Sequence, residues 1–231
     1  MQILLVRHGE SLGNVDPQVH ATTADHAVPL SDRGREQARE AGRRLAAYFE
    51  QRAGGEPGAG GEARAEPRHV RLWVSPYLRT RETADALQET AGAWITDRVE
   101  HVLLCEQQFG LFDGVPEREL PERFPREFAH YDMQRRFGGK FWARMPQGES
   151  WFDVAQRIHQ AFGTFQRDAQ AHGIRDLVVV GHGVTLRAFV MMWCHHSPEW
   201  FEREPNPPNA AIRLIDRGVD RGYVFEGFAR R

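Results

Sequence analysis

Two short runs of branched apolar residues, each ending in a His-Gly pair, constrain the fold of this chain most strongly. Residues 2–6 lead into Arg-His-Gly, and residues 176–180 lead into Gly-His-Gly. Runs of this length that are rich in Val, Leu and Ile are typical of strands buried on both faces of a parallel sheet. An apolar helical segment follows the second run directly, so the sequence favours strands that alternate with helices.

The rest of the chain continues this alternation. The patterns predict strands at 70–74 and Trp94–Thr96, and a closing hairpin of 210–215 with 223–225. They predict helices over 32–49, over 75–90 with Ser75 as N-cap, and over 184–195. A further long helix is predicted to begin at the cap residue Ser150, and its apolar stripe consists of Phe152, Ala155, Ile158, Phe162, Phe165 and Ala169. We therefore expect an α/β fold with a mostly parallel sheet, in which ligands bind at the carboxyl ends of the strands.

Two segments depart from the alternation. Residues 53–67 are rich in Gly, Pro and Glu, which predicts a flexible surface excursion within one domain. Residues 97–148 are aromatic-rich and broken by prolines, with short helices predicted around 117–136. We expect this second segment to be an irregular, helical lid insertion over the site.

Composition excludes several classes of protein. The chain has 231 residues, a formal net charge of −2 and two cysteines without a CxxC pair. A general nucleic-acid binder normally carries a basic excess, and a small secreted protein normally carries more cysteines. There is no apolar run of about 20 residues and no signal-peptide pattern at residues 1–10. We expect a cytoplasmic protein with no membrane and no nucleic-acid partner; the sequence does not predict an oligomeric state.

Two arginines and two histidines follow the ends of three predicted strands: Arg7, His8, Arg79 and His182. Because the carboxyl ends of parallel strands meet at one edge of a sheet, we expect these side chains to lie together. Adjoining glycines and helix N-termini expose backbone N–H groups there, and arginine forks suit phosphate. An imidazole kept neutral by flanking arginines, with its tautomer fixed by a carbonyl or carboxylate, is a competent nucleophile. The sequence therefore predicts phosphoryl transfer through a histidine.

A leaving alkoxide also needs a proton, and Glu106 is the predicted general acid. It follows the predicted third strand, in an irregular segment that can fold over the same edge. A carboxyl group beside a phosphate dianion holds its proton more firmly, which suits this role. Glu10, Asp113 and Glu149 are alternative acids.

Five blocks of the sequence, in order, carry a family pattern: RHGESLGN at 7–14, LSDRGREQA at 30–38, SPYLRTRETA at 75–84, GES at 148–150 and VGHG at 180–183. In these blocks the chain resembles the histidine phosphatase superfamily, also called the phosphoglycerate-mutase-like family. The resemblance extends from residue 3 to about residue 190. It implies a single domain over 1–231, folded as a three-layer αβα sandwich.

The resemblance also implies roles for individual residues. His8 would be the nucleophile that becomes phosphorylated, and Glu106 the proton donor. The residues implied to bind the phosphoryl group are Arg7, Arg79 and His182, helped by Asn14 and the Gly183 backbone. The resemblance implies no metal and no cofactor.

Residues 107–114 depart from the phosphoglycerate mutases of this family. Mutases carry a basic, Tyr-containing segment after the acid glutamate, which holds the glycerate carboxylate. Here the stretch contains no Lys, Arg or Tyr. We therefore expect a metal-independent phosphomonoester hydrolase that acts on a small phosphorylated metabolite. The residues expected to line the substrate side of its pocket are His20, Thr22, Thr23 and His26.

Three alternatives stay open. They are a phosphoglycerate-mutase-type phosphotransferase, a non-catalytic phosphate- or phosphoprotein-binding protein, and a metallohydrolase. His195 and His196 give the metal hypothesis little support, because the helix dipole favours histidines in a last helical turn. No nearby ligand set completes a site with them.

Overall fold

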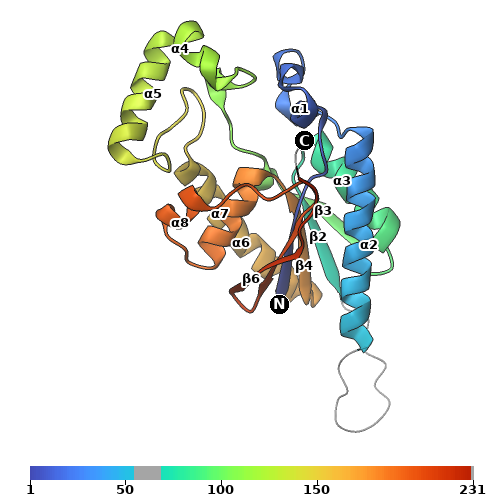
Figure 1. The fold of residues 1–231 in the computed structure, drawn as a ribbon. Helices are drawn as coiled ribbons and strands as arrows, with labels where there is room; N and C mark the ends of the chain where they lie inside the picture. Colours follow the sequence, from blue (N-terminus) through green and yellow to red (C-terminus); the bar gives the residue numbers. More distant parts are fainter. Residues whose placement is uncertain (55–68, 230–231) are drawn as a thin grey trace.

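The computed structural model describes residues 1–54 and 69–229, and in this part of the chain six strands form one sheet (Figure 1). The strands are β1 (Gln2–Arg7), β2 (Val70–Val74), β3 (Asp97–Glu100), β4 (Asp176–Gly181), β5 (Ile212–Asp216) and β6 (Val219–Phe225), in the order β3-β2-β4-β1-β5-β6. Parallel pairing joins β3, β2, β4 and β1, and β5 and β6 extend the sheet in antiparallel pairing. The α/β prediction with a mostly parallel sheet is confirmed.

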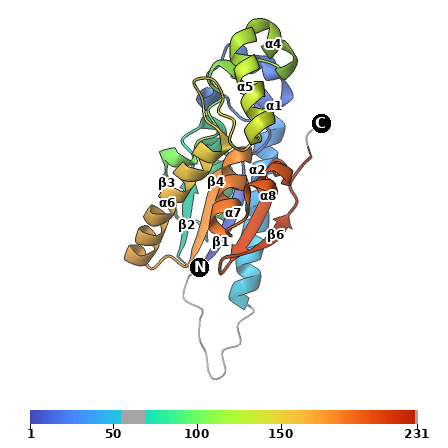
Figure 2. The same ribbon diagram turned by 90° about the vertical axis from the view of Figure 1, so that its left-hand side faces the viewer.

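Helices cover both faces of the sheet and make a three-layer αβα sandwich (Figures 1 and 2). Helices α2 (Asp32–Gly54) and α3 (Leu78–Ala91) lie on one face, and α6 (Trp151–His172) and α7 (Gly183–Trp193) lie on the other. Successive strand residues point to opposite faces, so Leu4 packs in the α2–α3 core and Leu5 in the α6–α7 core. Burial on both faces explains the unbroken apolar runs of β1 and β4.

The carboxyl ends of the parallel strands lie beneath a lid segment, which we define as residues 101–148 (Figure 1). It contains α4 (Leu120–Arg123), α5 (Pro125–Gly138) and the short 3-10 turns η3 (Val102–Leu104), η4 (Gly110–Phe112) and η5 (Glu117–Glu119). Its buried side chains form a small core of their own: Phe112, Leu120, Tyr131 and Ala143. The insertion was predicted to begin at residue 97, but residues 97–100 form the edge strand β3.

A second group of short elements lies next to the lid segment, between β1 and α2. It consists of α1 (Leu12–Val15), η1 (Pro17–Ala21) and η2 (Asp25–Ala27), and α8 (Pro198–Arg203) follows α7 on the other side. Within the described residues, no helix is long and apolar enough to cross a membrane.

The third strand begins later than predicted. The prediction placed it at Trp94–Thr96, but the N–H groups of Trp94 and Ile95 both donate to the Ala91 carbonyl and so prolong the turn that ends α3. The buried Ile95 side chain anchors this turn in the core. The closing hairpin forms as predicted, with Gly218 at positive φ in its turn.

Two helices differ from prediction at their ends. Helix α3 has Tyr77 at its N-cap position, not Ser75, because the Ser75 hydroxyl is hydrogen-bonded to a histidine instead. Helix α2 continues to Gly54, so the first two residues of the predicted 53–67 excursion are helical; its other residues, 55–67, lie outside the described residues.

Helix α6 begins with a capping box, as the sequence predicts. The Ser150 hydroxyl accepts from the Asp153 N–H, and the Asp153 carboxylate accepts from the Ser150 N–H. The prediction that Phe152 lies on the buried stripe is wrong: it is 36% exposed, and Trp151 is buried in its place.

Candidate active site

A cavity of about 690 Å³ lies at the carboxyl end of β1, beneath the lid segment. That volume is typical of a small-molecule site. The lining residues come from the end of β1, from η1 and η2, from α3 and α7, and from the lid segment. Those used below are Arg7, His8, Asn14, His20, Asp25, Arg79, Glu106, Phe109, Phe112, Asp113, Val115, Pro116, Arg118, Val184 and Asn206.

The backbone fixes the tautomer of His8. Its Nδ1 lies 2.7 Å from the carbonyl oxygen of Gly9. A carbonyl only accepts hydrogen bonds, so Nδ1 carries the proton and Nε2 carries the lone pair. Gly9 is required here, because a Cβ atom on it would lie 2.2 Å from the carbonyl oxygen of Gly34. The imidazole is therefore oriented by a turn that only glycine can form.

The second histidine lies behind the first. The rings of His8 and His182 meet edge to face, with centroids 5.3 Å apart. His182 is fully buried, and its Nε2 lies 2.8 Å from Ser75 Oγ. Burial, and then the charges of Arg79 and Arg7 and of His8, hold the pKa of His182 well below its usual range. Burial and the neighbouring arginines therefore disfavour protonation of the second imidazole.

The two arginines are buried and held by different partners. Arg7 donates to the carbonyl of Pro207. Arg79 donates to the backbone carbonyl of Asp25, lies 3.0 Å from its carboxylate and stacks over the Tyr77 ring. The Asp25 carboxylate neutralises Arg79 and fixes its position beside the cavity. The sequence motifs do not identify Asp25 as the partner of Arg79.

Asn14 is positioned by a residue that sequence reasoning missed. Asn209 donates from Nδ2 to the side-chain oxygen of Asn14 at 3.0 Å and lies 3.4 Å from the carbonyl oxygen of His8. Asn209 is 1% exposed and lies just before β5. Asn209 lies beside β1 because β5 pairs with β1 in antiparallel orientation. No local sequence motif predicts this pairing.

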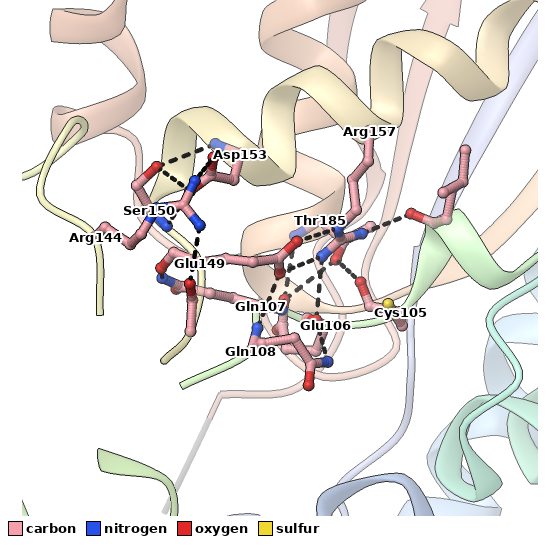
Figure 3. A network of polar contacts seen from close by, with 12 residues as sticks. Cys105, Glu106, Gln107, Gln108, Arg144, Glu149, Ser150, Asp153, Arg157 and Thr185 are labelled. Atoms are coloured by element: carbon pink, nitrogen blue, oxygen red, sulfur yellow. Dashed lines mark hydrogen bonds and ion pairs between the residues drawn. The ribbon is translucent and has the colours of Figure 1, made fainter. Parts of the chain in front are cut away.

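Glu106 lies against the N-terminus of α7 (Figure 3). Its carboxylate accepts hydrogen bonds from the N–H groups of Gln107, Val184 and Thr185, at 3.0 to 3.4 Å. The Thr185 hydroxyl oxygen lies 3.2 Å from the carboxylate and donates its one proton to the carbonyl of Cys105 at 2.7 Å. Helix α7 therefore holds a carboxyl group at the cavity by its exposed N–H donors.

The loop that carries Glu106 is tied to α6 (Figure 3). Arg157 pairs with Glu149 at 2.8 Å and donates to the carbonyls of Leu103 and Glu106. Glu149 also accepts from the Gln108 N–H at 3.0 Å. This network gives the GES block at 148–150 a structural role. The Glu149 carboxylate holds the loop that carries Glu106, residues 105–108, which we call the acid loop, and Arg157 neutralises that carboxylate.

A family model for the histidine phosphatase superfamily (branch 1) matches residues 3–53 and 59–226. This chain belongs to that superfamily. It is 37% identical to a phosphoglycerate mutase-like protein of Arabidopsis thaliana, over 97% of this chain and 76% of that protein. It is 24% identical to a broad-range acid phosphatase of Saccharomyces cerevisiae, over 96% and 87%. Among solved structures, YhfR of Bacillus stearothermophilus has a TM-score of 0.68 at 21% identity over 99% and 98% of the two chains, which shows the shared fold.

Of the residues predicted for catalysis and phosphoryl binding, Arg7, His8, Asn14, Arg79 and Glu106 line one cavity, whereas His182 and Gly183 are not among its lining residues. The residues expected on the substrate side do not all line it either. His20 lines the cavity and lies 3.5 Å from the Asp25 carboxylate. Thr22 and Thr23 are not among the lining residues, and His26 lies outside, edge-on to the ring of Tyr77.

Gly183 is the first residue of α7, and its own N–H lies at the helix start. A Cβ atom there would lie 2.8 Å from the side chain of Asn206, a lining residue absent from the predicted set. The small residue therefore lets Asn206 approach the start of α7 closely.

The alternative acids of this member of the superfamily occupy different environments. Glu10 is bound by Ser31 and Arg33, and Glu149 by Arg157. Asp113 lines the cavity with Glu106. The thiol of Cys105 is not an activated nucleophile, because burial raises its pKa.

The histidine pair that suggested a metal lies at the end of α7. The ring of His196 stacks on Trp200, with centroids 4.3 Å apart. Across residues 1–54 and 69–229, no three His, Cys, Asp or Glu side chains form a group that could hold a metal ion.

Proposed function

We propose that this histidine phosphatase is a metal-independent phosphomonoesterase that acts on a small phosphorylated metabolite through a phosphorylated His8. The observation that carries the proposal is the His8 Nδ1–Gly9 carbonyl hydrogen bond beside a cavity lined by Arg7 and Arg79. A neutral imidazole with its lone pair on Nε2 is the nucleophile that phosphoryl transfer needs.

The first half-reaction transfers the phosphoryl group to His8. Arg7 and Arg79 bind its oxygens, with the Asn14 side chain and the start of α7 as further donors. His8 Nε2 forms a bond to phosphorus as the bond to the leaving oxygen breaks. Glu106 gives its proton to that oxygen, so that the product leaves as an alcohol.

The second half-reaction restores the enzyme. Water attacks the phosphorus, Glu106 takes a proton from it, and the P–N bond breaks. Inorganic phosphate leaves, and His8 is neutral again. The arginines stabilise the charge that spreads over the phosphoryl oxygens.

Two features support hydrolysis over mutase activity, although relatives of this chain bear both kinds of name. Residues 107–114 supply no Lys or Arg to the cavity. The single further arginine among its lining residues, Arg118, is 83% exposed and lies beside Glu119. A carboxylate of a phosphoglycerate would therefore find no buried cation beyond the phosphoryl-binding pair.

The test is hydrolysis of an aryl phosphate in the presence of a chelator. An aryl leaving group needs little protonation, so activity does not depend on the assignment of Glu106. We expect wild-type turnover between pH 5 and 8, and a loss of at least about 10³-fold in His8→Ala. His172→Ala, on the exposed end of α6, is the matched control and should keep full activity.

Equal turnover by wild type and His8→Ala would overturn the proposal. Absence of turnover in folded wild type, with faster interconversion of phosphoglycerate isomers than release of phosphate, would favour the mutase. Tight phosphate binding with neither activity would favour a phosphate-binding protein.

A further inference from the structure

The charged and titratable groups that line the candidate active site are three arginines, Arg7, Arg79 and Arg118, and three carboxyl groups, Asp25, Glu106 and Asp113. Glu106 is the proposed general acid and carries a proton when substrate enters. A phosphate dianion therefore brings the formal charge of the occupied cavity to −1, which disfavours a further anion on the substrate. Any second charge on the substrate is then selected by where the remaining carboxylates lie.

Two of the three carboxylates have assigned partners. Asp25 is bound to Arg79 at 3.0 Å, and Glu106 is bound by the start of α7. Asp113 follows η4 in the lid segment, and none of the salt bridges among the described residues includes it. Asp113 is therefore an exposed lining carboxylate that forms no ion pair among the described residues.

The surroundings of Asp113 carry excess negative charge. Partial burial, and then the charge of Asp25, raise the pKa of Asp113, and the opposing effects of His20 and Arg79 are smaller. The raised pKa means that the environment disfavours a second negative charge at this point. A cation from the substrate would relieve that repulsion.

The third lining arginine, Arg118, is a weak competitor. Its side chain is 83% exposed and lies 3.6 Å from Glu119. Water and its own neighbour screen it, so it attracts a substrate anion only weakly. The same segment of the chain contributes apolar residues to the lining: Phe109, Phe112, Val115 and Pro116.

From the charge balance and the position of Asp113, we infer that the leaving group of the substrate carries an amine or another cation, which pairs with Asp113. A leaving group with a carboxylate or a second phosphate is disfavoured. This inference rests on the proposed phosphatase function, and it names the substrate class of the same site.

The experiment compares three two-carbon phosphate esters that differ only in the distal group. They are phosphoethanolamine, 2-hydroxyethyl phosphate and phosphoglycolate, which are cationic, neutral and anionic there. We expect kcat/KM to fall in that order, with at least about a tenfold difference between the first and last. Equal values, or a preference for phosphoglycolate, would overturn the inference.

Two variants locate the effect. Asp113→Asn removes the charge with little change in size and should bring the amine-to-carboxylate ratio close to one. Glu122→Gln removes the same charge from an exposed position in the same segment, outside the cavity lining, and should keep the wild-type ratio. A ratio that is unchanged in Asp113→Asn would contradict the role of Asp113.

Failure of this inference can be distinguished from failure of the proposed function. Aryl phosphate turnover without discrimination among the three esters leaves the phosphatase in place and removes the inference. If wild type hydrolyses neither the aryl phosphate nor the esters, the proposed function fails. Calorimetric dissociation constants for the three esters then decide the inference by the same expected order.

Discussion

At the residue scale, His8, which lines the cavity, and the buried His182 behind it are held by different means. A backbone carbonyl fixes the proton of His8 on Nδ1, whereas a side chain, Ser75, contacts Nε2 of His182. The first arrangement suits the nucleophile that we propose. The second places a neutral ring behind it, where burial and nearby cations prevent protonation. Both orientations depend on groups that themselves take no part in bond making.

Ser75→Ala tests the second arrangement. The change removes the Oγ atom 2.8 Å from His182 Nε2 and leaves a buried ring nitrogen without this partner. We expect a loss of about 1 kcal/mol in the free energy of unfolding. We expect kcat for an aryl phosphate to fall about tenfold to a hundredfold, because a ring displaced by a fraction of an ångström misaligns the site.

The matched control is Ser197→Ala. It removes the same atom from the N-cap of α8, where Ser197 Oγ accepts from the Trp200 N–H. It should cost about 1 kcal/mol of stability as well, with no effect on kcat. Urea unfolding and steady-state kinetics separate the two outcomes. Equal kcat values in both variants would show that Ser75 has only a structural role.

At the element scale, the acid loop is held from two sides. The start of α7 donates to the Glu106 carboxylate, and Arg157 of α6 binds the loop backbone (Figure 3). The chain before α6 also runs against this loop: Gly148 lies so near that a Cβ atom would be 2.4 Å from the Gln108 carbonyl oxygen. Close backbone contact of this kind leaves no flexible side chain to give way.

Gly148→Ala should therefore displace the acid loop. We expect a destabilisation of about 1–3 kcal/mol from overpacking, and a fall in kcat of about tenfold or more for alkyl phosphates, which need the acid. Gly138→Ala is the control, because a Cβ atom at Gly138 meets nothing within 4 Å. It should be neutral or slightly stabilising. An active, stable Gly148→Ala enzyme would contradict the proposed constraint.

The elements whose signals are local in sequence were predictable, and those that depend on distant partners were not. The capping box of Ser150 and the buried runs of β1 and β4 need only neighbouring residues. Ser75 has the pattern of an N-cap, but its hydroxyl meets a ring 107 residues away. The third strand begins later than predicted because the hydrophobic pattern gives no sign of the extra turn at the end of α3.

The candidate site follows the same division. The motif residues could be gathered at one sheet edge from the rule that parallel strands end together. Asn209 and Asp25 could not, because each acts through a contact made by the fold: one with His8 and Asn14, the other with Arg79. Thr22 and Thr23 were expected in the cavity from their place in a loop, which does not define a direction.

At the scale of the whole molecule, the sheet brings together residues from position 7 to position 209 at a single edge. The lid segment lies over this edge (Figures 1 and 2) and contributes residues from the stretch 106–118 to the lining of the cavity. This arrangement buries the His182 side chain fully, and burial lowers its pKa. That burial links the global stability of the protein to pH.

The free energy of unfolding should decrease as the pH is lowered below about 6.5, in part because of His182. In the unfolded chain its imidazole gains a proton near its ordinary pKa of 6.5, whereas in the folded protein the pKa is well below that. The unfolded state then binds more protons, and the free energy of unfolding drops by as much as about 1.4 kcal/mol per pH unit. At higher pH both states are neutral and the effect vanishes.

Urea unfolding of wild type and His182→Gln at pH 7.5 and 5.5 measures this contribution. The variant should lose less stability than wild type on acidification. The exposed His172→Gln, at the end of α6, should behave like wild type. An identical loss in wild type and His182→Gln would show that the proton is taken up elsewhere.

The central claim is a covalent phosphoenzyme on His8, and trapping it is the most direct measurement. Glu106→Gln lacks the base that activates water in the second half-reaction but still accepts a phosphoryl group from an aryl phosphate. Rapid quenching in base, which preserves a P–N bond, followed by mass spectrometry of peptides should find one phosphoryl group on the peptide that contains His8, and it should disappear on acid treatment. A peptide that stays unmodified while aryl phosphate is consumed, or a phosphoryl group on another residue, would contradict the account.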